Sequence, residues 1–289
     1  PWTMDVLTGK AGRFGPVSCA RSPPFNVVLR MRPWSGRVTS YSPQWAYFRS
    51  AVEDDPHSSM GKKVLITGGA GFIGSALCRE LSRLGHEVFV LDDLSFGRRE
   101  LAPVDDDHFH RADIRDRKAV MQVLATVRPE EVLHLAAIHF IPYCNAHPVE
   151  AADINITGTI NVLDACEQAD SVRQVFLAST AAVYPIAEGA IAEDHPLGPL
   201  DIYGITKLAT EKLASEFHHR TGTPVIIGRF FNAFGPNETN PHLIPEIQKQ
   251  VRAGVRTLSL GNLDPKRDFI HTEDMGRAIV ALLNAGLGG

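Results

Sequence analysis

Cysteine is scarce in this chain of 289 residues, and the four cysteines, Cys19, Cys78, Cys144 and Cys166, lie far apart with no C-x-x-C pair. This spacing argues against a zinc knuckle and a disulfide framework, and it favours a reducing compartment, so we expect a cytoplasmic protein. A run of about 18 apolar residues, as a membrane span would require, is also missing. We therefore expect no membrane partner.

An excess of basic charge is missing as well. Lys and Arg number 29 against 33 Asp and Glu, which gives a net charge of −4. A protein that binds a phosphate backbone needs a positive surface, so we expect no nucleic-acid partner. Hydrophobic residues make up 44% of the chain, which at this length is enough for a large buried core.

The first 59 residues differ from the rest in composition. They hold seven basic and four acidic residues and all three tryptophans, and they show no sustained strand or helix periodicity. Met60 stands directly before the first strong strand pattern. We expect residues 1–59 to be a disordered extension or translated upstream sequence, with an organelle targeting segment as the alternative.

From Lys63 onward, short apolar runs alternate with segments of helical periodicity. Strands are expected at 63–67, 87–91, 131–135, 174–178 and 225–228, and helices at 72–84, 116–127, 151–167 and 203–220. Strands joined by helices of this length build a parallel sheet that is covered on both faces. The sequence therefore predicts an α/β fold with a doubly wound parallel sheet over residues 60–230.

A glycine-rich turn joins the first strand to the first helix. In Thr67-Gly68-Gly69-Ala70-Gly71-Phe72-Ile73-Gly74, the glycines at 68, 71 and 74 allow a tight turn, close approach to a pyrophosphate, and close packing of helix on strand. Asp92 ends the second strand, where a carboxylate binds ribose hydroxyls and repels a 2′-phosphate. We therefore predict a Rossmann domain that binds NAD rather than NADP. Asp93 is a second candidate for the ribose contact, and Arg98 is a cation that would suit a 2′-phosphate.

Tyr203 and Lys207 lie four residues apart on a predicted helix and hence on one face of it. An ammonium beside a phenol favours the phenolate and lowers the pKa of the tyrosine, and a positive nicotinamide ring acts in the same direction. Tyr203 would then serve as a base near neutral pH. Thr180 ends a buried strand at the edge where such sheets bind ligands, so it would orient a substrate hydroxyl or relay a proton.

Further motifs follow in order along the chain: Asp113-Ile114, His134-Leu135-Ala136-Ala137, Asn155 and Arg229-Phe230-Phe231-Asn232-x-x-Gly235-Pro236. Together with the glycine turn, Thr180 and the Tyr203/Lys207 pair, they stand in the order seen in extended short-chain dehydrogenase/reductases. From about Lys62 to its end, the chain resembles a nucleotide-sugar epimerase/dehydratase of that family. The resemblance implies an NAD that stays bound while a hydride leaves a sugar carbon and returns to it.

The resemblance also implies which residues contact each ligand. The cofactor-binding residues would be Gly68, Gly71, Phe72, Ile73, Gly74, Asp92, Asp113, Ile114, Ala136, Ala137, Asn155, Tyr203 and Lys207. The residues that bind the nucleotide-diphosphate sugar would be Thr180, Asn232, Leu243, Arg267 and His139. A homodimer would form through the helix near residues 151–167 and the helix that bears Tyr203 and Lys207. No metal is expected, because His108 and His110 have no third ligand at a fitting spacing.

The reaction type is predicted from an absence. In the 4,6-dehydratases of the resembling family, acidic residues follow the hydroxyl residue, whereas here Ala181 and Ala182 follow Thr180. Methyl groups carry out no acid–base chemistry, so we predict a 4-epimerase that acts through a transient 4-keto sugar, with Tyr203, Lys207 and Thr180 as catalytic residues. Two alternatives stay open: a 4,6-dehydratase or 4-ketoreductase of a deoxysugar pathway, and a non-catalytic NAD-sensing protein.

The C-terminal part of the chain is short. After a helix expected near 272–284 the sequence stops at Gly289, whereas the substrate region of the resembling family continues. We therefore expect residues 231–289 to form a partial, truncated nucleotide-sugar-binding region that is interleaved with the Rossmann domain. Within it, residues 261–268 resemble GDP-mannose 4,6-dehydratases more than UDP-galactose epimerases, so the choice of nucleotide stays open.

Overall fold

The computed structural model describes residues 61–187, 189, 191–238, 240–261, 264 and 267–285, and nearer the N-terminus the backbone of three short strands. Clustering of contacts divides the chain into two compact units. The smaller unit joins Pro1–Phe48 to Glu238–Arg267, and the larger joins Arg49–Asn237 to Asp268–Gly289. Most of residues 1–59 lie outside the described part, so the expectation of an extension there stays a prediction.

The larger unit contains a six-stranded sheet in the order β6-β5-β4-β7-β8-β9. All neighbouring strands are parallel, which confirms the doubly wound fold. Chain order reverses between β4 and β7, and this switch point is where such sheets bind ligands. The strands are β4 (Lys63–Thr67), β5 (Glu87–Asp92), β6 (Phe109–Arg111), β7 (Glu131–His134), β8 (Gln174–Thr180) and β9 (Val225–Phe230).

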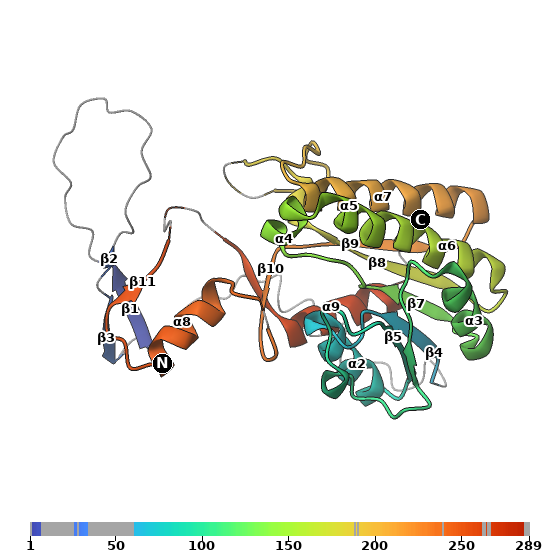
Figure 1. Cartoon of the computed structure of the whole chain (residues 1–289), viewed down its shortest axis with the longest axis horizontal. Coiled ribbons are helices and arrows are strands. Elements are labelled where there is room, and N and C mark those ends of the chain that lie inside the picture. Colours follow the sequence, from blue (N-terminus) through green and yellow to red (C-terminus); the bar gives the residue numbers. More distant parts are fainter. Residues whose placement is uncertain are drawn as a thin grey trace. The chain divides into compact units, whose positions relative to one another are not determined.

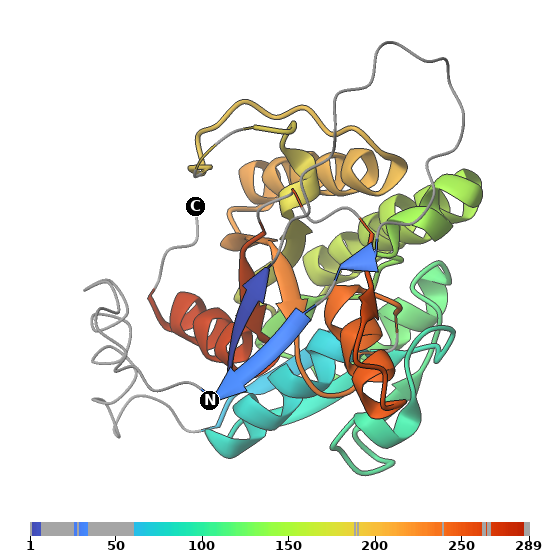
Figure 2. The ribbon, with the colours of Figure 1, turned by 90° about the vertical axis from the view of Figure 1, so that its left-hand side faces the viewer.

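Helices cover both faces of this sheet. On one face α2 (Phe72–Arg83) packs with α9 (Thr272–Asn284), and on the other lie α3 (Arg117–Val127), α6 (Gly158–Gln168) and α7 (Ile202–Thr221). In both views, α7 (gold) and α9 (red) lie on opposite sides of the strands (Figure 1, Figure 2). Successive side chains of each strand point to opposite faces of the sheet, and apolar side chains occupy both faces. The sheet therefore has a separate hydrophobic core on each face. None of the helices that the structure describes is long and apolar enough to cross a bilayer.

The helix expected at 151–167 is broken by a wider turn. The structure has α5 (Pro148–Ala152), a π-helical turn η2 (Asp153–Thr157) and then α6. Single π turns of this kind are often found at functional sites, and this one contains the buried Asn155. The sequence analysis did not predict β6, a strand of three residues, or α4 (Ile141–Ala146), a helix of six.

Beyond β9 the strands are short. In the larger unit, β10 (Asn232–Phe234) pairs in parallel with β12 (Phe269–His271). In the smaller unit, α8 (Leu243–Arg252) precedes β11 (Leu258–Ser259), which pairs with β2 (Asn26–Val27), and β1 (Trp2–Val6) pairs with β3 (Leu29–Pro33). The Gln250 amide bonds both backbone groups of Ser259, at 2.9 and 2.8 Å, and so fixes α8 to β11.

Helix α9 should be an integral part of the larger unit. Ile279 is fully buried among apolar side chains of α2 and the sheet, so Ile279→Ala should lower the free energy of unfolding by about 2–5 kcal/mol. Urea denaturation would measure the change. Ile186→Ala is the control, because Ile186 is 90% exposed and its truncation should change stability by less than about 0.5 kcal/mol. Equal stability of the two variants would show that α9 is not integral.

Candidate active site

The glycine turn brings the ends of three strands together. Gly68 has φ +75°, in the region that favours glycine, and its N–H donates to the Leu91 carbonyl of β5 at 2.9 Å. A Cβ on Gly68 would lie 2.7 Å from the nitrogen of Ala136, just after β7, and a Cβ on Gly74 would lie 2.2 Å from the Gly68 oxygen. Both positions therefore need glycine, because the backbones approach too closely for a side chain.

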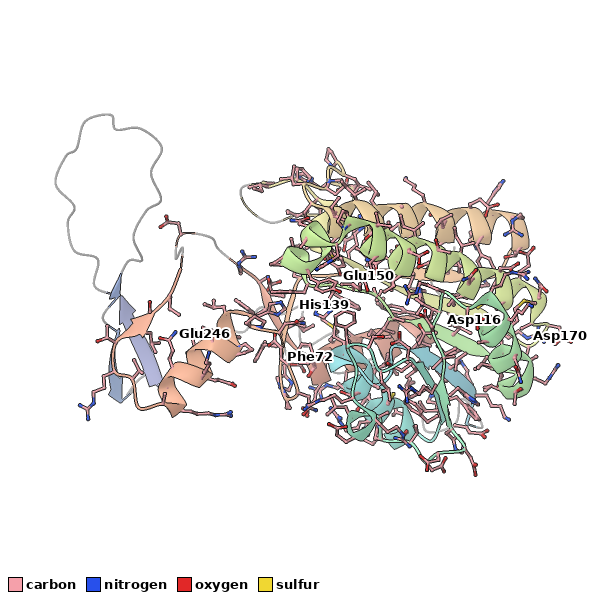
Figure 3. All side chains as sticks on the ribbon, in the orientation of Figure 1. Phe72, Asp116, His139, Glu150, Asp170 and Glu246 are labelled. Atoms are coloured by element: carbon pink, nitrogen blue, oxygen red, sulfur yellow. The ribbon has the colours of Figure 1, made fainter. Side chains whose placement is uncertain are left out.

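The first turn of α2 is open to a ligand. Gly71 precedes the helix and no side chain caps it, and a Cβ there would meet only the Gly68 oxygen, at 3.2 Å. Phe72 and Ile73 begin the helix and are partly exposed. Figure 3 shows Phe72 and His139 at one end of the sheet and Asp170 at the other. The free N–H groups of such a turn bind phosphate, so these residues fit the pyrophosphate of a dinucleotide.

Asp92 lies at the end of β5 and is only 7% exposed. Its carboxylate accepts hydrogen bonds from the backbone N–H of Ala70 (3.0 Å) and of Leu94 (2.9 Å). Burial raises the pKa of Asp92, and these two hydrogen bonds oppose that rise. The cation that would suit a 2′-phosphate, Arg98, is paired with Glu100 at 3.5 Å. The site therefore fits the unphosphorylated ribose of NAD.

Asp113 and Ile114 follow β6. The Arg115 guanidinium binds the Asp113 carboxylate at 2.6 Å and lowers its pKa. Ile114 is buried, and a Cβ on Gly158 would come within 2.4 Å of its side chain. The two residues therefore lie side by side at the carboxyl end of β6, and their contact with the adenine stays a prediction.

The segment after β7 is fixed by Asn155. The Asn155 amide accepts the Ile138 N–H at 2.8 Å and donates to the Ile138 carbonyl at 3.0 Å, and it also donates to the Thr206 hydroxyl of α7 at 2.9 Å. Asn155 thus positions the chain beside Ala136 and Ala137. Both alanines are partly exposed, and His139 is exposed. Contacts of these residues with cofactor or substrate stay predictions.

A buried histidine, which the sequence analysis quoted only as part of a motif, connects β4, β7 and α6. His134 Nδ1 lies 2.6 Å from the Thr67 hydroxyl, and Nε2 lies 2.9 Å from the Thr159 hydroxyl. The Thr159 hydroxyl donates to the Asn155 carbonyl, so Nε2 must donate to Thr159, and Nδ1 accepts from Thr67. His134 is therefore neutral. Burial, together with the charge of Lys207, lowers its pKa to about 3.

The catalytic candidates meet where β8 ends. Asp201 caps α7 by accepting the Gly204 N–H at 2.8 Å, and Gly204 lets the helix approach η3 (Ala181–Val183), since a Cβ there would lie 2.3 Å from the Ala182 oxygen. This close approach brings the Tyr203 hydroxyl into a hydrogen bond with Thr180. The structure thus places Thr180, Tyr203 and Lys207 at one strand end.

The pKa of Tyr203 differs from the sequence-based expectation of a lowered value. Burial raises it, and the hydrogen bond with Thr180 opposes the rise. Burial lowers the pKa of Lys207 to about 8, and the charge of Glu211 opposes that change. The lysine is 3% exposed, so its ionisation depends on buried neighbours that the sequence pattern did not bring together.

The remaining candidates for substrate binding lie apart from this cluster in the chain. The Asn232 amide donates to the Asp268 carbonyl at 2.9 Å and so joins β10 to the chain before β12. Leu243 begins α8 and is 44% exposed, and Arg267 is exposed. Both belong to the smaller unit. Their contacts with substrate stay predictions.

Comparisons with known proteins agree with this geometry. Residues 64–289 match the model of the NAD dependent epimerase/dehydratase family. Over 230 residues the chain is 34% identical to the UDP-glucose 4-epimerase of Lactobacillus helveticus, covering 74% of this chain and 69% of the relative. It is similar to the structure of UDP-glucose 4-epimerase from Thermus thermophilus in complex with NAD, with a TM-score of 0.71, 32% identity and coverage of 78% and 76%. It is also similar to the structure of UDP-N-acetylglucosamine 4-epimerase from Methanobrevibacter ruminantium, with a TM-score of 0.69 and 27% identity. That match covers 77% of this chain and 73% of the other.

The buried neutral state of His134 should make the protein sensitive to acid. Because the pKa of His134 is about 3 in the folded chain and near 6.5 in the unfolded chain, the unfolded chain binds more protons between these values, and stability should fall as the pH falls through this window. The loss should reach about 1.4 kcal/mol per pH unit and be absent in His134→Gln. Urea denaturation from pH 7 to pH 4 would measure it. Equal slopes for the two proteins would contradict the prediction.

Proposed function

Because the chain belongs to the NAD dependent epimerase/dehydratase family, we propose that it is a nucleotide-sugar 4-epimerase that acts on a UDP-hexose. Relatives and structural neighbours named as UDP-glucose 4-epimerases and a UDP-N-acetylglucosamine 4-epimerase support this reaction and this nucleotide. For the sugar we propose glucose and galactose, which differ only at C4.

The observation that carries the proposal is the pairing of Tyr203 with Thr180 beside two methyl side chains. An epimerase needs a group that removes and returns one hydroxyl proton, and this pair supplies it. A dehydratase needs further acids and bases, yet Ala181 and Ala182 follow Thr180. The acidic groups of this helix and its cap are already bound: Asp201 by the Gly204 N–H, Glu211 by Arg229 and Glu216 by Arg220. Elimination of water therefore lacks its catalysts.

In the proposed mechanism, Tyr203 accepts the proton of the sugar's 4-hydroxyl and later returns it. Thr180 holds the Tyr203 hydroxyl through their hydrogen bond and relays the proton between Tyr203 and the 4-hydroxyl of the sugar. The Lys207 ammonium stabilises the phenolate while the proton is away. NAD, when bound, supplies a hydride acceptor that gives the hydride back, so the reaction consumes no net oxidant. The 4-keto sugar must present its opposite face before the hydride returns.

Binding of the ligands follows from the same set of residues. The open turn at Gly71 and the first turn of α2 would hold the cofactor pyrophosphate, and the Asp92 carboxylate would hold the adenosine ribose. We propose Arg267 for the substrate diphosphate, since a guanidinium binds phosphate bidentately. Asn232, Leu243 and His139 complete the proposed substrate contacts.

For the assembly we propose a homodimer that forms through α5, α6 and α7. Each of these neighbouring helices exposes a large apolar side chain: Val149 is 82% exposed, Ile160 45% and Ile205 51%. A second copy of the chain would bury these residues. We also propose a cytoplasmic location, as the wide spacing of the cysteines favours a reducing compartment. As domains we propose residues 60–230 for NAD binding and 231–289 for the nucleotide sugar.

Proton NMR should detect the proposed reaction directly. With NAD present, UDP-galactose should give the anomeric signal of UDP-glucose, and Tyr203→Phe should lower the rate by about 100-fold or more because the proton carrier is lost. Tyr143→Phe is a matched control, since the Tyr143 hydroxyl donates to Glu150 at 2.9 Å and takes no part in the proposed chemistry. A 4-keto-6-deoxy product would contradict the epimerase proposal, and so would wild-type turnover by Tyr203→Phe.

Sedimentation velocity should show whether two chains form a dimer through α5, α6 and α7. The wild-type protein should sediment as a dimer, and Ile160→Glu with Ile205→Glu should give a folded monomer because charge is introduced into the apolar contact. Leu84→Glu is the control, since Leu84 is 42% exposed at the end of α2, on the other face of the sheet. A wild-type monomer, or a dimer of the double variant, would refute the proposed interface.

A further inference from the structure

Glu211 continues the spacing of the catalytic pair. Tyr203, Lys207 and Glu211 stand four residues apart on α7, so they lie on one face of the helix in successive turns. Lys207 is 3% exposed and Glu211 is 4% exposed. A carboxylate this deeply buried is expected only where charged and hydrogen-bonding partners compensate for the lost water.

The partners of Glu211 come from the ends of two neighbouring strands. Ser179 of β8 and Arg229 of β9 lie opposite each other in the parallel register, on the sheet face that α7 covers. The Ser179 hydroxyl donates to Glu211 Oε1. The Arg229 guanidinium donates from Nε to Oε1 at 2.9 Å and from Nη2 to Oε2 at 2.8 Å. This two-point contact holds the carboxylate in one orientation.

The fixed carboxylate acts on Lys207, one helical turn away. Burial favours the neutral amine of Lys207 and lowers its pKa to about 8, whereas Glu211 favours the ammonium. The other titratable or charged groups around the Tyr203–Lys207 face are Tyr203 itself, His134 at the end of β7, Cys144 on α4, Asp201 at the start of α7 and Arg229 on β9. His134 is neutral and the Cys144 pKa is raised to about 11, so neither carries charge near neutral pH.

We propose that Glu211 is a positioning residue which, held by Arg229 and Ser179, keeps Lys207 in the charged form that Tyr203 needs. The inference rests on the proposed function for the role of Tyr203. The charge relation between Glu211 and Lys207 is a property of the chain by itself. It can therefore be tested without cofactor, substrate or turnover.

Arg229 carries the charge opposite to that of Glu211 and makes further hydrogen bonds of its own. Its Nη1 donates to the Tyr184 hydroxyl at 2.8 Å and to the Glu193 carbonyl at 2.9 Å, so it also anchors the chain between β8 and α7. Because Arg229 is a cation bound to the same carboxylate, we expect it to oppose the action of Glu211 on Lys207. Removing the carboxylate and removing the guanidinium should therefore shift the ionisation of Lys207 in opposite directions, although both changes break the same ion pair.

The experiment is an NMR titration of the full chain with lysine labelled at ¹³Cε, in which Lys207→Arg identifies the Lys207 signal. Glu211→Gln should lower the pKa of Lys207 by about one unit or more, and Glu211→Asp, which keeps the charge, should restore it to within about half a unit. Arg229→Gln should raise it. Glu216→Gln is the matched control, because Glu216 is exposed on the same helix and pairs with Arg220.

The pH profile of epimerisation is the second measurement. If turnover needs charged Lys207, activity falls as the pH rises through the lysine pKa, and Glu211→Gln should move this alkaline limb to lower pH by the same amount. An unchanged Lys207 titration in Glu211→Gln, or shifts of the same sign in Glu211→Gln and Arg229→Gln, would overturn the proposal. If Glu211→Gln does not fold, a lower pKa of Lys207 in Arg229→Gln would overturn the proposal by itself. A wild-type chain without epimerase activity would refute the proposed function instead and leave the titration as the test.

Discussion

The burial of polar side chains where the parallel strands end is the constraint on which the site depends. On the sheet face covered by α6 and α7, apolar residues alternate along each strand until Thr67, His134, Ser179 and Arg229 take their places. None of these groups can be left without partners in a dry interior. Thr67 pairs with His134, and the other three bond to residues of the covering helices. The positions of α6 and α7 are therefore fixed by hydrogen bonds as well as by apolar packing.

The position of α7 follows from two of these connections. Asn155 bonds to Thr206 near the start of the helix, and Glu211, farther along the same helix, bonds to Arg229 and Ser179. Lys207 lies between these two contacts, and Tyr203 lies just before the first of them. An apolar interface tolerates small sliding motions because it has no direction, whereas a bidentate ion pair does not. The polar contacts therefore give the tyrosine a defined distance from Thr180.

How much of this arrangement the sequence predicts depends on how local its causes are. The glycine turn and the Tyr203/Lys207 pair were predicted because each spacing has a local geometric meaning. The π turn was missed because it is tied to a contact of Asn155 with Ile138, which lies 17 residues away in sequence. The Glu211–Arg229 pair spans 18 residues and two elements. The continued four-residue spacing from Lys207 to Glu211 was a signal for it, but only the fold shows which strand supplies the partner.

An epimerase needs a tyrosine that is neither a strong base nor a strong acid, because the same hydroxyl takes and returns one proton in each turnover. Burial raises the pKa of Tyr203, and the Thr180 hydrogen bond opposes the rise. A charged lysine beside the hydroxyl favours the phenolate while the proton is away, whereas a neutral one does not. Burial lowers the pKa of Lys207 to about 8 and Glu211 opposes that change, so Glu211 favours the charged form. In the proposed mechanism, the buried carboxylate behind the lysine therefore serves the same reversible proton transfer as the tyrosine.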